Sequence, residues 1–316
     1  MEIFFSIILF VAGLAILIKG SDFFVGSSAF VARHFGVSKL IIGLTLVSMG
    51  TSLPELGASV YASYAGEGEI AVGNVVGSNI ANIAIVLGAC ILLRQIRIKK
   101  KMIRRDGLIM LGATLLFIFL VIGGINRWEG LVLMIIFAIY ILLLYKHNKT
   151  DIEDENLCEL SDRFCPRESS LKVETIKLIA GCIGIFLGSK LLVDSAVDIA
   201  QTFGISQSVI GSTLIAFGTS VPELAVSMTA ILKRLEDISI GNIIGSNIFN
   251  ILWVIGVAAL VADLAVDEIL LYMNIPIMLI VSALLLIFMA VRGKLERWQG
   301  IIFVAIYVVF IFLNYW

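Results

Sequence analysis

Two acidic residues, Glu55 and Glu223, occur in nearly identical polar segments inside long apolar stretches. The first segment reads GTSLPELGAS (Gly50–Ser59) and the second reads GTSVPELAVS (Gly218–Ser227). A carboxylate at the centre of a bilayer costs several kcal/mol and is a functional candidate by default. Neither segment contains a lysine or arginine, so we expect a cation to be the partner of both carboxylates.

Hydroxyl groups accompany the first glutamate at helical spacing. Ser48, Thr51, Ser52 and Glu55 stand at i, i+3, i+4 and i+7, which predicts one shared helical face. Pro54 lacks an N–H and its ring clashes with the carbonyl four residues back, so we expect a distorted turn with loosened carbonyls. The second segment repeats the arrangement with Thr219, Ser220, Pro222 and Glu223. Carboxylate, hydroxyl and carbonyl oxygens are the hard ligands that Ca²⁺ and Na⁺ accept.

A second duplicated block follows each glutamate: GNVVGSNIANI (Gly73–Ile83) and GNIIGSNIFNI (Gly241–Ile251). Each block spaces two asparagines and a serine at i, i+4 and i+8, namely Asn74, Ser78 and Asn82 in the first and Asn242, Ser246 and Asn250 in the second. Paired glycines four residues apart (Gly73 with Gly77, Gly241 with Gly245) predict close helix approach. An isolated hydroxyl or amide here is more often a tie between membrane helices than a ligand, whereas the glutamates are functional candidates.

The composition indicates an all-α membrane protein. The chain is 59% hydrophobic and 15% charged, with a mean hydropathy of +1.04, against roughly 45–50% apolar and about 25% charged in soluble domains. Apolar runs of about 18–25 residues can cross the hydrocarbon as helices. We predict ten spans, and the first is a span rather than a signal peptide: 2–32, 38–64, 69–93, 104–123, 128–145, 172–201, 206–232, 238–262, 268–291 and 298–315.

The chain contains an internal repeat. A shift of 168 positions aligns Gly20–Gly88 with Gly188–Gly256 without a gap, with about 31 of 69 positions identical. These identities fall largely on Gly, Thr, Ser, Pro, Glu and Asn, which argues for duplication rather than shared apolar composition. Five spans per half is an odd number, so the halves must have inverted topology, with the site at their interface. The predicted units are 1–145, a polar linker at 146–170, and 171–316.

Loop charges predict the orientation. Basic residues gather in the connections near 33–39, 94–105, 233–234 and 292–297, while the opposite connections hold acids and a single Arg127. We expect the protein to lie in the cell (plasma) membrane. By the positive-inside rule, both termini face outside and the linker faces the cytoplasm. The net charge of −1 gives no reason to expect nucleic acid as a partner. No role follows for Asp22, Lys190, Asp194 and Asp198 in the two long spans.

Histidines and cysteines do not suggest an enzyme or a disulfide framework. Only His34 and His147 are available for a metalloprotease-like site, and both stand near span ends. Cys90 and Cys182 lie in apolar runs, whereas Cys158 and Cys165 lie in the polar linker, and all four read as free thiols. We therefore expect a transporter with no cofactor, whose partners are cations and lipid.

At GTSLPE with GNVVGSNIAN, and GTSVPE with GNIIGSNIFN, the chain resembles the cation/Ca²⁺ antiporter superfamily, specifically its prokaryotic Na⁺/Ca²⁺ exchangers. The resemblance covers all ten predicted spans, with α-repeats at about 43–90 and 211–258. It implies alternating access in which the first and sixth helices slide against the rest. The Na⁺ ligands it implies are Thr51, Ser52, Glu55, Ser78, Thr219, Ser220, Glu223 and Ser246, with Asn82 and Asn250 lining the centre. The implied Ca²⁺ site comprises Glu55, Glu223, Thr51, Thr219 and backbone oxygens at Ser48 and Ala216.

Two departures from the family pattern stand out. Ser48 has Ala216 as its repeat partner, a change that a backbone ligand tolerates. Asn250 stands where many relatives carry Asp, which leaves two acids in the site and argues against K⁺ dependence.

Two other functions remain open, and a third is disfavoured. An H⁺/Ca²⁺ exchanger of the same superfamily would share the paired glutamates, although its repeats lack the Thr-Ser pair before proline. A cation channel would need a similar oxygen-lined path, and a membrane enzyme would need ligands that this chain lacks. We favour Na⁺/Ca²⁺ antiport by a monomer.

Overall fold

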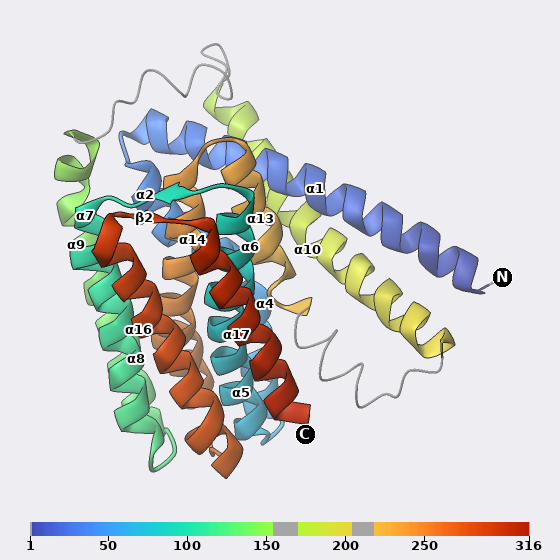
Figure 1. The fold of residues 1–316 in the computed structure, drawn as a ribbon, viewed down its shortest axis with the longest axis vertical. Coiled ribbons are helices and arrows are strands. Elements are labelled where there is room, and N and C mark those ends of the chain that lie inside the picture. Colours follow the sequence, from blue (N-terminus) through green and yellow to red (C-terminus); the bar gives the residue numbers. More distant parts are fainter. Residues whose placement is uncertain (1, 154–169, 204–217, 316) are drawn as a thin grey trace.

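The computed structural model describes residues 2–153, 170–203 and 218–315, and almost all of them are helical (Figure 1). The first half contains α1 (Glu2–Phe35), α2 (Lys39–Ile42), η1 (Gly43–Val47), α3 (Ser48–Thr51), α4 (Leu53–Tyr64), α5 (Gly68–Ala81), η2 (Asn82–Leu87), α6 (Gly88–Leu93), β1 (Ile96–Arg97), α7 (Lys100–Met102), η3 (Ile103–Gly107), α8 (Leu108–Val121) and α9 (Arg127–Glu153). The second contains α10 (Leu171–Thr202), α13 (Val221–Leu232), α14 (Glu236–Phe249), η6 (Asn250–Val254), α15 (Ile255–Val261), η7 (Leu270–Asn274), α16 (Ile275–Arg292), β2 (Lys294–Leu295) and α17 (Arg297–Tyr315).

Seven helices of the described ranges are long and apolar enough to cross a membrane, or eight if the pair Lys39–Thr51 and Leu53–Tyr64 counts as one bent span. The seven match the predicted first, third, fifth, sixth, eighth, ninth and tenth spans within a few residues. The membrane-protein fold class is therefore confirmed. The count of ten stays a prediction, because the seventh predicted span begins in residues outside the described ranges and the fourth carries three charges at its start.

The duplicated blocks form the centre of the bundle. In the spans Gly68–Leu93 and Glu236–Val261, 78% and 83% of the most apolar stretch is buried, whereas only 22% is buried in the two long spans Ile3–Phe35 and Leu171–Thr202. Gly241 and Gly245 permit this packing, because a Cβ added to them would lie 2.8 Å from the Leu40 carbonyl oxygen and 2.6 Å from that of Leu44. Their predicted role in close approach is confirmed.

Equivalent segments of the two halves pair at opposite ends of the molecule. β1 pairs antiparallel with β2 through Ile96 opposite Leu295. The repeat counterpart of Ile96 is Leu264, and it pairs with Ile125 through two backbone hydrogen bonds of 2.9 Å. The Ile125 turn joins α8 to α9 at the end of the bundle away from the β1–β2 ribbon (Figure 1). The π-helical turns repeat likewise, since η2 and η6, and η3 and η7, stand close to 168 positions apart.

Helices α1 and α10 form an antiparallel pair that runs obliquely beside the bundle (Figure 1). Their backbones meet at glycines: a Cβ on Gly20 would lie 2.8 Å from the Ile185 nitrogen, and one on Gly188 would lie 2.5 Å from the Leu17 nitrogen. Near one end of the pair, buried Glu174 accepts a 2.8 Å hydrogen bond from Ser27 Oγ. These contacts join the two halves through α1 and α10.

An ion pair ties α1 to the bundle. Lys233, at the end of α13, places its Nζ 2.7 Å from Asp22 Oδ1 and 2.8 Å from the Asp22 main-chain oxygen. Asp22 had no role assigned from sequence, and its partner lies 211 residues away. Lys233 is largely shielded from solvent whereas the Asp22 side chain is 48% exposed, so the contact lies at the edge of the interface between α1 and the bundle.

Gly188→Ala should destabilise the protein. The new methyl group would overlap the α1 backbone, and overpacking of this kind costs about 1–3 kcal/mol. The matched control is Gly112→Ala in α8, where an added Cβ meets nothing within 4 Å. Thermal unfolding of the purified variants in detergent should show a lower midpoint for Gly188→Ala only. Equal midpoints would contradict backbone-to-backbone packing of α1 and α10.

Candidate functional site

The helix is interrupted at the first GTS-x-PE motif. α3 ends at Thr51, α4 begins at Leu53, and the two helical segments bend by 47°. Pro54 lies in the first turn of α4, where its missing N–H cannot bond the Gly50 carbonyl. The predicted distortion is confirmed, but the predicted continuous helical face from Ser48 to Glu55 is wrong, because the break at Ser52 separates them.

The second copy has the same local geometry. Ser220 precedes α13 with φ −87° and ψ 1°, close to the φ −89° and ψ 13° of Ser52. Both serines occupy the sparsely populated bridge region, where active-site residues are often found. Pro222 lies in the first turn of α13, as Pro54 does in α4. The two motifs therefore build equivalent helix starts from opposite halves of the chain.

Both glutamates are fully buried, and each lies in the first turn of its helix. A helix N-terminus favours a negative charge. Ser52 Oγ of the first half donates to Glu223 Oε1 of the second at 2.9 Å. The structure therefore brings both predicted acids into one site that spans the repeat interface.

Many oxygen atoms of this site lack a hydrogen-bond partner within the described residues. Buried polar atoms are paired in the great majority of cases, so a cluster of unpaired oxygens is unusual. A cation that accepts several oxygen ligands would satisfy such a cluster. The unpaired atoms are both carboxylate oxygens of Glu55, Oε2 of Glu223, Oδ1 of Asn82 and Asn250, Oγ1 of Thr219, and Oγ of Ser220 and Ser246.

The remaining predicted residues take several environments. Ser48 uses its hydroxyl to bond the Leu44 carbonyl at 2.8 Å, and its own carbonyl accepts from Thr51 Oγ1 at 3.3 Å. Ser78 is buried. Ala216 lies outside the described residues. Among the described residues, a Cβ added to Gly73 would meet only the Leu270 side chain at 3.6 Å and one added to Gly77 would meet nothing within 4 Å, so close helix approach at these two glycines stays a prediction.

Equivalent asparagine–serine hydrogen bonds occur in the two halves, each between the helix that carries a glutamate and the helix that follows it. Asn74 Nδ2 donates to Ser59 Oγ at 2.9 Å, and Asn242 Nδ2 donates to Ser227 Oγ at 3.0 Å. Asn242 Oδ1 also accepts from Thr51 Oγ1 at 3.1 Å, which links the halves again. Ser59 and Ser227 were missed from the sequence, although their identity at the repeat offset was a usable signal.

Soft metal ligands are absent from the site in the part of the chain that the structure describes. No group of three or more His, Cys, Asp or Glu side chains there could hold a metal ion. Cys90 and Cys182 are free thiols, as predicted, while Cys158 and Cys165 lie outside the described residues. The candidate site thus combines two carboxylates with neutral hydroxyl and amide oxygens.

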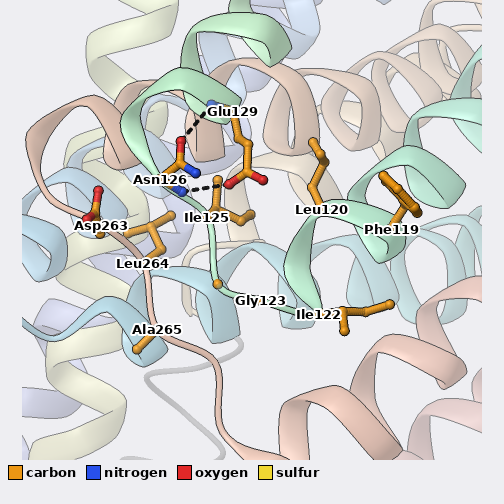
Figure 2. A pocket seen from close by; sticks show the side chains of 11 residues that line it. Phe119, Leu120, Ile122, Gly123, Ile125, Asn126, Glu129, Asp263, Leu264 and Ala265 are labelled. Carbon is orange, nitrogen blue, oxygen red and sulfur yellow. Dashed lines mark hydrogen bonds between the residues drawn. The ribbon is translucent and has the colours of Figure 1, made fainter.

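A separate pocket of about 660 Å³ lies where α8 meets α9, against residues 263–265 (Figure 2). Its polar groups start a helix: Asn126 Oδ1 accepts from the Glu129 nitrogen at 3.1 Å, and Glu129 Oε2 accepts from the Asn126 nitrogen at 2.8 Å. This reciprocal pairing is a capping arrangement at the start of α9. We assign the pocket no part in the candidate site.

Comparison with known proteins identifies the family. The model of the sodium/calcium exchanger protein family matches residues 5–146 and 174–316. The chain is 39% identical to a membrane protein of Methanocaldococcus jannaschii over 95% of both chains, and 34% identical to the sodium/calcium exchanger MaX1 of Methanosarcina acetivorans over 97% of both. Its fold matches the sodium-calcium exchanger NCX_Mj with a TM-score of 0.84 and 37% identity over 98% of both chains. The chain belongs to the sodium/calcium exchanger family.

Proposed function

We propose that this protein is a secondary-active antiporter that exchanges Na⁺ for Ca²⁺ across the membrane by alternating access. One observation carries the proposal: two fully buried carboxylates from opposite halves are linked through the Ser52–Glu223 hydrogen bond, and within the described residues they have no basic partner and are accompanied by oxygens that lack hydrogen bonds. Two carboxylates neutralise one divalent cation, and the same oxygens can hold several Na⁺ instead. Competition for one set of ligands then produces exchange without further machinery.

Na⁺ as the coupling ion has support from two directions. The Thr-Ser pairs before each proline supply neutral hydroxyl oxygens beside the carboxylates, and three of these hydroxyls belong to fully buried side chains. MaX1, which the chain matches over nearly its full length, is described as a sodium/calcium exchanger. We take Thr51, Ser52, Ser78, Thr219, Ser220 and Ser246 as Na⁺ ligands beside Glu55 and Glu223, with Asn82 and Asn250 at the centre and Ca²⁺ also contacting the Ser48 and Ala216 carbonyls.

The charges near the β1–β2 ribbon support a membrane orientation. Arg94 pairs with Glu236 at 3.0 Å and Lys99 pairs with Asp237 at 3.0 Å, and Lys294 belongs to β2 itself. Basic residues favour the cytoplasmic side. We place this end of the bundle on the cytoplasmic side of the plasma membrane. The 146–170 linker is then on the same side, and both termini are outside the cell.

Na⁺-loaded proteoliposomes provide the direct test. Wild-type protein should take up ⁴⁵Ca²⁺ when Na⁺ is inside and a Na⁺-free medium is outside, because outward Na⁺ flow drives inward Ca²⁺ flow. Uptake should persist with an ionophore that dissipates proton gradients, and it should stop when a Na⁺ ionophore removes the driving gradient.

Other outcomes would identify the competing functions. Uptake driven by an imposed proton gradient without Na⁺ would indicate an H⁺/Ca²⁺ exchanger. Unitary currents in planar bilayers would indicate a channel.

A further inference from the structure

Four asparagines meet at the interface between the two repeats. Asn79 is in α5 and Asn247 is in α14, while Asn82 begins η2 and Asn250 begins η6. All four side chains are buried, with at most 1% of any residue exposed. Asn79 and Asn247 were not among the residues predicted from the sequence, and each is the repeat counterpart of the other.

The hydrogen bonds among these amides are crossed between the halves. Asn82 Nδ2 donates to Asn247 Oδ1 at 3.2 Å, and Asn250 Nδ2 donates to Asn79 Oδ1 at 3.1 Å. Asn79 Nδ2 in turn donates to the Asn247 main-chain oxygen at 3.3 Å. Each outer asparagine therefore accepts from the central asparagine of the other repeat.

These bonds determine which end of each central amide faces the site. An asparagine amide has a donor nitrogen and an acceptor oxygen, and a half-turn about its last bond exchanges them. With Nδ2 held by the outer asparagine, Oδ1 of Asn82 and of Asn250 is directed elsewhere, and both oxygens are buried with no hydrogen-bond partner among the residues that the structure describes. A cation binds the oxygen end and is repelled by the hydrogens of the nitrogen end.

We propose that Asn79 and Asn247 are positioning residues that hold the amides of Asn250 and Asn82 with their oxygens toward the transported cation. This inference rests on the proposed function only in taking the ligand to be a cation. Each positioning residue acts across the repeat interface: Asn247 acts through Asn82, and Asn79 acts through Asn250. Without the outer acceptor, a central amide loses the bond that opposes its half-turn.

A simple helix-tying role makes a different prediction. Buried amides often join membrane helices, and their loss lowers stability without a specific effect on ligand affinity. The crossed pairing separates the two roles, because a positioning effect must vanish when its own target side chain is absent. A tie would have the same effect whichever central asparagine is present.

The test measures ⁴⁵Ca²⁺ binding to purified protein at equilibrium. Asn247→Leu should weaken Ca²⁺ binding by about tenfold or more, the usual scale for losing a group that orients a metal ligand. Combined with Asn82→Ala it should add no further loss, whereas combined with Asn250→Ala the losses should multiply. Asn79→Leu should add no further loss of Ca²⁺ affinity to Asn250→Ala, whereas its loss should multiply with that of Asn82→Ala. If a Leu variant does not fold, the same cycle is run with Ala at that position.

Asn247→Asp is the conservative variant. It retains an oxygen that accepts from Asn82 Nδ2 and gives up only the contact with the Met110 sulfur. It should bind Ca²⁺ at least as tightly as wild type. A loss as large as that of Asn247→Leu would overturn the positioning role, as would equal losses in both alanine backgrounds or a lower unfolding midpoint with unchanged Ca²⁺ affinity.

The outcomes also separate this inference from the proposed function, because Ca²⁺ binding needs no Na⁺ step. The crossed dependence together with absent Na⁺-driven uptake would support the positioning role and contradict Na⁺ coupling. Background-independent losses with Na⁺-driven uptake intact would overturn only the positioning role. Wild-type protein that bound neither Ca²⁺ nor Na⁺ would overturn both.

Discussion

Glu55→Gln and Glu223→Gln should each abolish Ca²⁺ exchange and leave the protein folded. Each change removes one of the two charges that neutralise Ca²⁺ in a site where burial leaves no solvent to replace it. Neither variant should lose stability without cations, because a buried carboxylate without a cationic partner is itself costly. The unfolding midpoint in a cation-free buffer should therefore stay the same or rise, although transport is lost.

Ca²⁺/Ca²⁺ exchange in proteoliposomes is the suitable measurement, since it involves no Na⁺ step. The matched control is Glu67→Gln, an exposed glutamate whose side chain caps no helix, and its exchange rate should equal that of wild type. If both glutamine variants retained more than about a tenth of the wild-type rate, the proposal that two carboxylates bind Ca²⁺ would be contradicted. A collapse in folding instead of transport would mean that the carboxylates have structural partners.

The internal repeat made much of the fold predictable from sequence. Identical Gly, Pro, Glu and Asn residues at one offset predicted two equivalent halves. The paired helix starts at Ser52 and Ser220 and the opposed Ile96–Leu295 and Ile125–Leu264 pairings agree with that equivalence. Span positions followed from hydropathy alone, because lipid requires long apolar helices whatever their partners.

The contacts between the two halves could not be predicted from the sequence. A repeat offset tells which residues are equivalent but not which lie opposite each other, so the Ser52–Glu223 hydrogen bond and the crossed asparagines could not be derived. The prediction of one shared helical face from Ser48 to Glu55 was wrong for a related reason. Helical spacing assumes a continuous helix, whereas Pro54 sits in the first turn of a new one.

Asn250→Asp should convert the site from two negative charges to three. A charge added at about 4 Å from a cation is worth on the order of 4 kcal/mol at an effective dielectric constant of about 20, before the cost of burying it. We expect Ca²⁺ to bind at least about tenfold more tightly and to leave more slowly, so that maximal exchange falls. The variant should also admit K⁺, because an extra carboxylate can be neutralised by one more monovalent ion.

Wild-type protein should behave differently in two measurable respects. With two carboxylates, one Ca²⁺ leaves the site neutral and three Na⁺ would leave it with a charge of +1, so the cycle should carry net charge. Na⁺-driven Ca²⁺ uptake should then respond to an imposed membrane voltage and should not require K⁺ on either side. If wild-type exchange were lost on complete removal of K⁺, the conclusion that Asn250 makes transport independent of K⁺ would be wrong.

Asn82→Asp is the matched variant, since it places the added charge at the repeat-equivalent position. Both substitutions also remove an amide donor: Asn250 no longer donates to Asn79 Oδ1, and Asn82 no longer donates to Asn247 Oδ1. That shared structural cost should lower the unfolding midpoint of both variants equally in cation-free buffer, and Ca²⁺ should raise both midpoints more than it raises that of wild type. If Ca²⁺ stabilised neither variant more than wild type, the central asparagines would not face the transported ion.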